Sequence, residues 1–184
     1  MNRISDRIEA LRRFMQTKGI SAFIVPSTDP HSGEYVPAHW ESRKWISGFT
    51  GSAGTAVITM SQGGLWTDSR YFLQAEKQLQ GSGLILFKDR LPETPSIADW
   101  LGSVLKPGEK VGIDGWVNST SEALQWQKAL EKYHLELVNV EDPFHLLWED
   151  RPSLPLNPPF ILPLEYSGET CNQKISRIQA ILKE

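Results

Sequence analysis

The chain has 184 residues, of which 40% are hydrophobic and 22% are charged, a composition typical of an ordinary globular protein with room for one sizeable core. A net charge of −3 with scattered Lys and Arg argues against nucleic acid or an anionic membrane surface as a partner, and no apolar run reaches the ~20 residues of a membrane span. The single cysteine, Cys171, excludes an internal disulfide framework, so the cytoplasm is the expected compartment.

The first part of the chain changes from a helical pattern to a strand pattern. Apolar residues recur at helical spacing within residues 3–18, namely Ile4, Ile8, Leu11 and Met15. Gly19 follows where a helix C-cap is expected. The apolar run 21–25 then predicts a short strand that ends at Pro26. Residues 27–37 are expected to form a loop, and residues 40–47 one short helix.

Glycines and small residues fill the run SGFTGSAGTA at residues 47–56. Loops that cradle phosphate open a helix, whereas this loop leads into the β-branched, strand-like run 55–60. The spacing of Gly48, Gly51 and Gly54 also fits neither the dinucleotide pattern nor the P-loop pattern. We therefore predict a structural turn here and not a phosphate site.

The next motif, WTDSRYF at residues 66–72, also follows a strand. Residues 64–67 are predicted to pair with 55–60 in a hairpin. Asp68 or Ser69 is then expected to cap a helix over residues 70–80. Arg70 lies in the first turn of that helix, where the helix dipole slightly disfavours a cation. Arg70 is therefore expected to have a specific partner, either Asp68 in a structural ion pair or a group outside the domain.

Further strands and helices alternate along the rest of the first part of the chain. Strands are predicted over 84–87, 110–114 and 135–138, and helices over 96–105 and 119–132. Alternating strands and helices indicate an α/β fold, and the hairpin makes its sheet mixed. The predicted architecture is a mixed β-sheet flanked by helices.

One loop cluster, made of Asp29, His31, Glu34 and His39, contains the side chains that bind divalent metals. Its spacing matches no standard ligand motif, and the prolines of the loop restrict its backbone. We therefore expect no metal site in this chain. No motif of a catalytic Ser or Cys or of a zinc protease is present either.

The composition changes beyond Pro143. Residues 151–164 carry five prolines, which favour an extended interdomain linker. A final helix is predicted to begin after Gly168 and to run to Glu184, and its apolar spacing repeats that of residues 3–18. We therefore expect a first domain over 1–150, a linker over 151–164, and the first helix of a second, related domain over 165–184. Trp148, beside the linker, is expected at a domain interface.

Four segments in this order resemble a known family. They are the loop PSTDPHSGEY at 26–35, the turn SGFTGSAGTA at 47–56, the motif WTDSRYFLQA at 66–75, and the run WEDRP at 148–152. Together they resemble the N-terminal domain of three-domain cytosolic Xaa-Pro aminopeptidases, the aminopeptidase P branch of the creatinase and prolidase superfamily. The resemblance covers the whole chain and implies a creatinase/prolidase N-terminal fold.

The resemblance also implies a reaction and its participants. These enzymes remove an N-terminal residue that precedes proline, using two divalent metal ions, commonly manganese, in a C-terminal catalytic domain. No catalytic residue or metal ligand carries over to this chain. The one substrate-binding residue that does is Arg70, in the WTD-x-RYF motif, although Ser69 stands where relatives often have glycine. The implied partners are peptides with proline in the second position, the protein's own second and catalytic domains, and a second subunit in a homodimer.

Three hypotheses follow. The first is a non-catalytic N-terminal part of an Xaa-Pro aminopeptidase that shapes the substrate cleft and domain packing and is inactive without the catalytic domain. The second is a free-standing binding or oligomerisation module, favoured by an exposed patch around Trp148 and the linker. The third keeps the fold but belongs to a creatinase or dipeptidase, and the long linker and the repeated helix pattern argue against it.

Overall fold

The structure is a computed structural model that describes residues 3–183. The chain divides into two compact units, one that ends at Ser153 and one that begins at Leu154. Glu184, the predicted end of the last helix, lies outside the described residues. No helix among residues 3–183 is long and apolar enough to cross a membrane.

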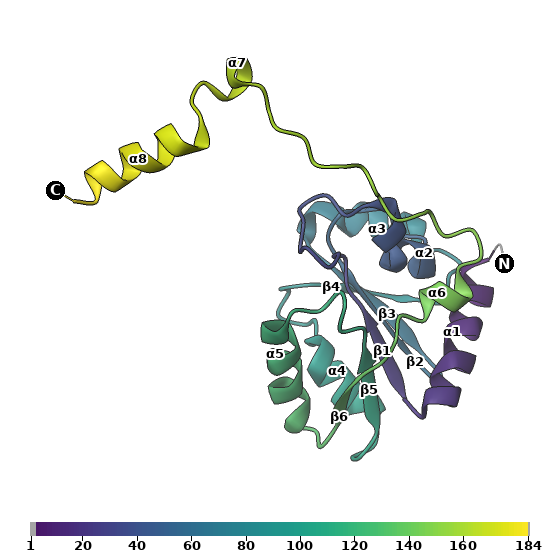
Figure 1. The fold of residues 1–184 in the computed structure, drawn as a ribbon. Coiled ribbons are helices and arrows are strands. Elements are labelled where there is room, and N and C mark those ends of the chain that lie inside the picture. The colour runs from purple at the N-terminus through teal and green to yellow at the C-terminus, as the bar shows by residue number, and fades with distance from the viewer. Residues whose placement is uncertain (1–2, 184) are drawn as a thin grey trace. The chain divides into compact units, whose positions relative to one another are not determined.

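The first unit is built on one six-stranded sheet with the order β4-β3-β2-β1-β5-β6 (Figure 1). Its strands are β1 (Ala22–Val25), β2 (Thr55–Thr59), β3 (Gly63–Thr67), β4 (Ile85–Lys88), β5 (Lys110–Ile113) and β6 (Glu136–Asn139). Strand β2 is antiparallel to β1 and β3, and the other neighbouring strands are parallel. The predicted mixed sheet is confirmed, as is the hairpin of β2 and β3, which the backbone N–H of Thr59 closes by donating to the oxygen of Gln62 at 2.9 Å.

Helices cover both faces of this sheet, with α1 and α6 on one side and α4 and α5 on the other (Figure 1). The helices are α1 (Ile4–Lys18), α2 (Ser42–Ser47), α3 (Phe72–Gln78), α4 (Ile97–Val104), α5 (Thr120–Glu131) and α6 (Phe144–Leu147). Two predicted helices begin with a tighter turn than expected. Residues 38–40 form the 3₁₀ turn η1 before α2, and Ser69–Tyr71 form the 3₁₀ turn η2 before α3. The side chain of Asp68 caps η2 by accepting from the backbone N–H of Arg70 at 3.0 Å.

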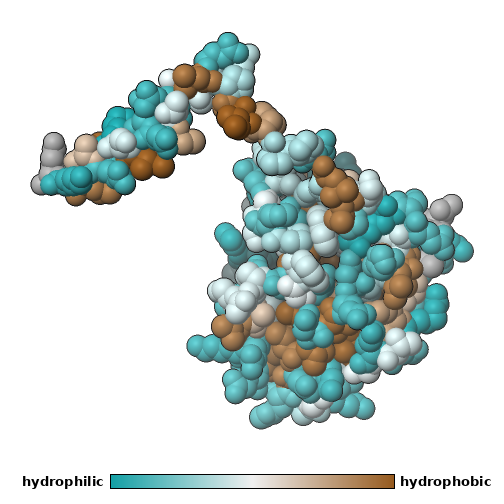
Figure 2. All heavy atoms as spheres, in the orientation of Figure 1, coloured by the Kyte–Doolittle hydropathy of each residue, from teal (hydrophilic) through white to brown (hydrophobic). Residues whose placement is uncertain are grey.

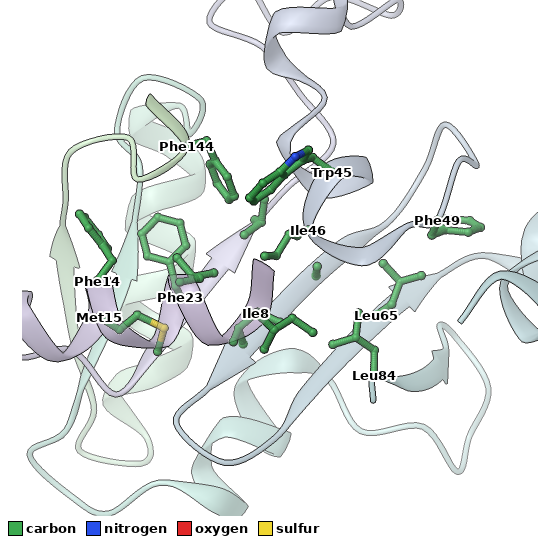
Figure 3. Close-up of a cluster of buried hydrophobic side chains, with 14 of the residues drawn as sticks. Ile8, Phe14, Met15, Phe23, Trp45, Ile46, Phe49, Leu65, Leu84 and Phe144 are labelled. Carbon is green, nitrogen blue, oxygen red and sulfur yellow. The ribbon is translucent and has the colours of Figure 1, made fainter. Parts of the chain in front are cut away.

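The core follows from the two-residue period of the strands. On β1, Phe23 and Val25 pack toward α1 and α2, whereas Ala22 and Ile24 pack toward α4 and α5. Both faces are therefore apolar, and each is covered by helices that bury an apolar stripe. Figure 3 shows the first of these layers, in which Ile8 and Met15 of α1 lie against the sheet together with Ile46 of α2.

The end of the first unit is fixed by aromatic and ionic contacts. The ring of Trp148 stacks on Trp45 with 5.6 Å between ring centres, so Trp148 packs within the first unit, where it is half-buried. Arg151 donates from Nη1 to Asp142 and from Nε to the backbone oxygen of His39 at 2.8 Å. These contacts hold the chain to the domain up to the first residues of the proline-rich segment.

The second unit contains two helices, α7 (Leu164–Ser167) and α8 (Cys171–Ile181). Helix α8 starts with a capping box, in which Thr170 accepts from the backbone N–H of Gln173 and the Gln173 side chain accepts from that of Thr170. None of the described residues from Leu154 onward is buried. Apolar side chains are exposed along α8, as the brown atoms in Figure 2 show, and they include Ile175, Ile178 and Ile181.

Candidate functional site

The candidate polar residues gather at one edge of the sheet. Every strand except β2 runs in the same direction, because β2 is antiparallel to both of its neighbours and the remaining pairs are parallel. The carboxyl ends of β1, β3, β4, β5 and β6 therefore lie beside the amino end of β2. Open α/β sheets bind their ligands at such an edge. Both the glycine-rich loop, which precedes β2, and Asp68, which follows β3, lie there.

The glycines of the loop 47–54 are required by close packing. Gly48 ends α2 with a φ of 74°, in the left-handed region that favours glycine. A Cβ atom on Gly51 would lie 2.3 Å from the ring of Phe49, and one on Gly54 would lie 2.9 Å from the backbone oxygen of Trp66. A larger residue at either position would displace the loop. The loop has bends at residues 52–53, and it opens a strand and not a helix, as expected.

A buried arginine that sequence reasoning missed holds this loop in place. Arg43 on α2 is 5% exposed, and its guanidinium donates to the backbone oxygens of Phe49 and Gly51 and, at 2.7 Å, to Oγ of Ser27. Burial lowers the pKa of Arg43 to about 10, and the hydrogen bonds compensate for the lost hydration. The sequence offers no signal for this role, since Arg43 and the neighbouring Lys44 look alike in a short polar helix.

Arg70 lies at the surface of the same edge, on η2. Oδ1 of Asp68 accepts from Nε of Arg70 at 2.9 Å and Oδ2 accepts from Nη2 at 2.7 Å, a bidentate pair. These hydrogen bonds hold the pKa of Asp68 below its usual value and raise the pKa of Arg70. The ion pair that the sequence suggested is present. The Arg70 side chain is nevertheless 67% exposed, so part of its guanidinium faces solvent.

One hydrogen bond joins the glycine-rich loop to the segment that carries Arg70. The hydroxyl of Tyr71 lies 2.6 Å from Oγ of Ser52, and this contact lowers the pKa of Tyr71. The guanidinium carbon of Arg70 lies 5.3 Å from the ring centre of Tyr71, within the range of a cation–π contact. Arg70 is therefore held on one side by Asp68 and on the other by the ring of Tyr71.

The loop cluster after β1 has a structural role. Asp29 is buried, and its Oδ1 accepts from the backbone N–H groups of His31 at 2.7 Å and Gly33 at 3.2 Å, which shapes the loop. His39 donates from Nδ1 to the backbone oxygen of Pro152 at 2.6 Å, while His31 and Glu34 are exposed. Across residues 3–183, no three His, Cys, Asp or Glu side chains are grouped so that they could hold a metal ion. The described residues therefore do not fit the two metal ions that the resemblance implies for the whole enzyme.

The family model described as the Creatinase/Prolidase N-terminal domain matches residues 7–148. Xaa-Pro aminopeptidase 1 of Dictyostelium discoideum is 39% identical over 98% of this chain and 30% of its own length. Xaa-Pro aminopeptidase 2 of Rattus norvegicus is 37% identical over 96% of this chain and 26% of its own length. The chain thus spans less than a third of either relative.

A comparison with solved structures leads to the same group of proteins. The X-prolyl aminopeptidase of Caenorhabditis elegans, described as a cytosolic enzyme with a di-nuclear active site, superposes with a TM-score of 0.85. It is 30% identical, and the match covers the whole of this chain and 31% of that protein. The similarity therefore includes the proline-rich segment and α8 as well as the sheet domain.

Proposed function

This chain belongs to the creatinase/prolidase N-terminal domain family, and on that premise we propose that it is the non-catalytic first domain of an Xaa-Pro aminopeptidase. Such an enzyme hydrolyses the peptide bond between an N-terminal residue and a following proline. The observation that carries the proposal is the match of nearly the whole chain to 26–31% of the length of enzymes with that name. The substrates are then peptides with proline in the second position.

Within this function, Arg70 is the residue that meets the peptide. A guanidinium has five N–H donors and stays charged, so it can bind a peptide carbonyl or carboxylate. Asp68 uses two of these donors, on Nε and Nη2, and the other three make no hydrogen bond within residues 3–183. The bidentate pair fixes the plane of the guanidinium, which reduces the entropy lost when a peptide binds. Asp68 and Tyr71 are therefore positioning residues for Arg70.

The catalytic chemistry belongs to another part of the protein. Two divalent metal ions, which we propose to be manganese, would activate the attacking water in a catalytic domain. The described residues supply no ligand set for these ions. This domain instead binds and orients the peptide and packs against the rest of the protein. We propose a cytoplasmic homodimer, and the description of the similar C. elegans protein as cytosolic supports the location.

Residues 154–183 fit a connection to a second domain. We propose that residues 151–164 are the interdomain linker and that residues 165–184, which include α8, are the start of that domain. The exposed apolar side chains on α8 support this, because an amphipathic helix gains little stability without a surface to pack against. A binding or oligomerisation module remains the second candidate, favoured by the nearly complete exposure of Phe160 and Ile161 on the same segment. A protein that forms defined oligomers but cleaves no Xaa-Pro peptide would support that candidate.

The test of Arg70 uses the full-length protein that carries this domain. Arg70→Ala should lower kcat/KM for an Xaa-Pro peptide by about tenfold to a hundredfold, the loss expected when a charge-assisted hydrogen bond to substrate is removed. Arg13→Ala is the matched control, because Arg13 is exposed on α1, away from this edge, and should leave the kinetics unchanged. Equal kinetics for Arg70→Ala and Arg13→Ala would remove the assigned role.

A further inference from the structure

A groove runs along the sheet edge from Arg70 to Trp126. It consists of two adjoining hollows that share Asp68, Asp89 and Arg90, the residues that follow β3 and β4. Arg70 lines the first hollow, and Trp126 of α5 lines the second. We propose that this groove binds the C-terminal part of a longer peptide substrate and that Arg90 pairs with the terminal carboxylate of that peptide. The inference rests on the proposed function, because it assumes that the peptide passes Arg70.

The charges in the groove favour Arg90 as the carboxylate-binding group. The guanidinium of Arg70 is already paired with Asp68 at hydrogen-bond distance. Arg90 is 88% exposed, and its nearest acidic contact is Nε to Oδ2 of Asp89 at 3.9 Å, beyond a hydrogen bond. The two carboxylates of the groove are thus matched by two guanidinium groups. Asp68 engages two donors of Arg70, whereas no donor of Arg90 makes a hydrogen bond to another described residue. An incoming carboxylate gains the most from this side chain.

The second hollow has an apolar floor suited to peptide side chains. Trp66 is buried there, and its Nε1 donates to the backbone oxygen of Pro95 at 2.9 Å, which fixes the indole. The ring of Phe87 stacks on Trp66 with 4.0 Å between centres and supports it from the neighbouring strand. Ala98 and Trp126 add further apolar surface. A site that combines an apolar floor with one free cation is typical of recognition of an apolar residue beside a carboxylate.

The backbone at Arg90 is unusual for a residue with a side chain. Its φ is 66°, in the left-handed region, where glycine is accommodated more easily than arginine. A backbone outlier of this kind is a reason to look for a function at that residue. An arginine does not stabilise this backbone conformation. What it adds at this position is a guanidinium group at the mouth of the groove.

The experiment measures hydrolysis of matched Xaa-Pro peptides by the full-length protein. Each peptide is longer than a tripeptide, ends in an apolar residue, and is made as the free acid and as the C-terminal amide. The wild-type protein should show a KM for the free acid about threefold to fivefold lower than for the amide, the size of a surface ion pair. Arg90→Gly and Arg90→Gln should raise the KM for the free acid to that of the amide and leave kcat for the amide unchanged. Arg13→Gln should preserve the wild-type preference.

The outcomes separate this inference from the proposed function. The proposal is supported if the wild-type protein prefers the free acid and this preference disappears only in the Arg90 variants. If the wild-type protein shows no preference for the free acid, or if the Arg90 variants keep that preference, the proposal that the groove binds the terminal carboxylate is wrong. The proposed peptidase function would be unaffected by either result. Loss of the preference in Arg70→Ala alone assigns the carboxylate to Arg70 and also overturns the proposal for Arg90. Absence of Xaa-Pro cleavage by the wild-type protein removes both proposals.

Discussion

Residues 3–153 and residues 154–183 show two ways in which a sequence can define a helix. In the first unit, every long helix buries an apolar stripe against a sheet, as α1 does with Leu11 and Met15. In the second unit, α8 is defined by its capping box and helical residues, yet it buries none of its side chains. Local signals therefore set where a helix begins, but only packing gives it most of its stability. The exposed apolar side chains of α8 are the observation on which the proposed second domain depends.

The largest expected contrast between the two units is in their response to loss of an apolar side chain. Leu101→Ala, at a fully buried position on α4, should lower the free energy of unfolding of the chain by about 2 to 5 kcal/mol. Ile178→Ala on α8 is the matched change at a side chain that is 51% exposed and should have almost no effect. Urea unfolding of both variants measures the difference. Equal losses would mean that α8 is packed as firmly as α4.

The next largest effect concerns the glycine-rich loop. Arg43→Met should lower the free energy of unfolding by about 2 to 4 kcal/mol, because two buried backbone oxygens would lose their charged donor. Arg43→Lys keeps a cation and should recover part of this loss. Thermal unfolding of the two variants checks the order. A loop that tolerated methionine as well as lysine would show that Arg43 does not hold it.

A smaller effect of opposite sign is expected at Arg90. Arg90→Gly should raise the free energy of unfolding by about 0.5 kcal/mol. The energy of backbone strain that glycine removes from the folded state exceeds the conformational entropy that it adds to the unfolded chain. Arg13→Gly, inside α1, is the matched change and should lower it by about 1 kcal/mol. Chemical denaturation resolves the signs. A destabilising Arg90→Gly would show that the Arg90 backbone is not strained.

The smallest effect is a dependence of stability on pH. Hydrogen bonds from Ser96, Tyr133 and Lys132 lower the pKa of Asp99 from 3.8 to about 2. A carboxylate with a lowered pKa in the folded state stabilises the protein above its unfolded pKa, and this stability is lost as the pH falls through the folded pKa. The wild-type protein should therefore lose stability between about pH 4 and pH 2. In Asp99→Asn this part of the pH dependence should be absent, which melting temperatures across that range would reveal.

The sequence predicted those features that depend on near neighbours. The mixed sheet follows from the alternation of strands and helices and from the hairpin. Asp68 is one of the two caps and one of the two Arg70 partners that the sequence suggests, because it is two residues from Arg70. The roles of Arg43 and Tyr71 could not be predicted in this way. Arg43 reaches Ser27 and Tyr71 reaches Ser52 only after the chain has folded, and no local pattern marks such pairs. The tighter turn η2 was missed because an Asp cap fits a 3₁₀ turn as well as an α-helix.

The proposed division of labour is tested most directly by measuring peptide hydrolysis by residues 1–184 and by the full-length protein, with an Xaa-Pro peptide and divalent manganese present in both assays. We expect the full-length protein to release the N-terminal residue and the isolated chain, although folded, to release none above the rate without protein. Hydrolysis by residues 1–184 alone would contradict the proposal that this domain orients the peptide while the chemistry takes place in another domain.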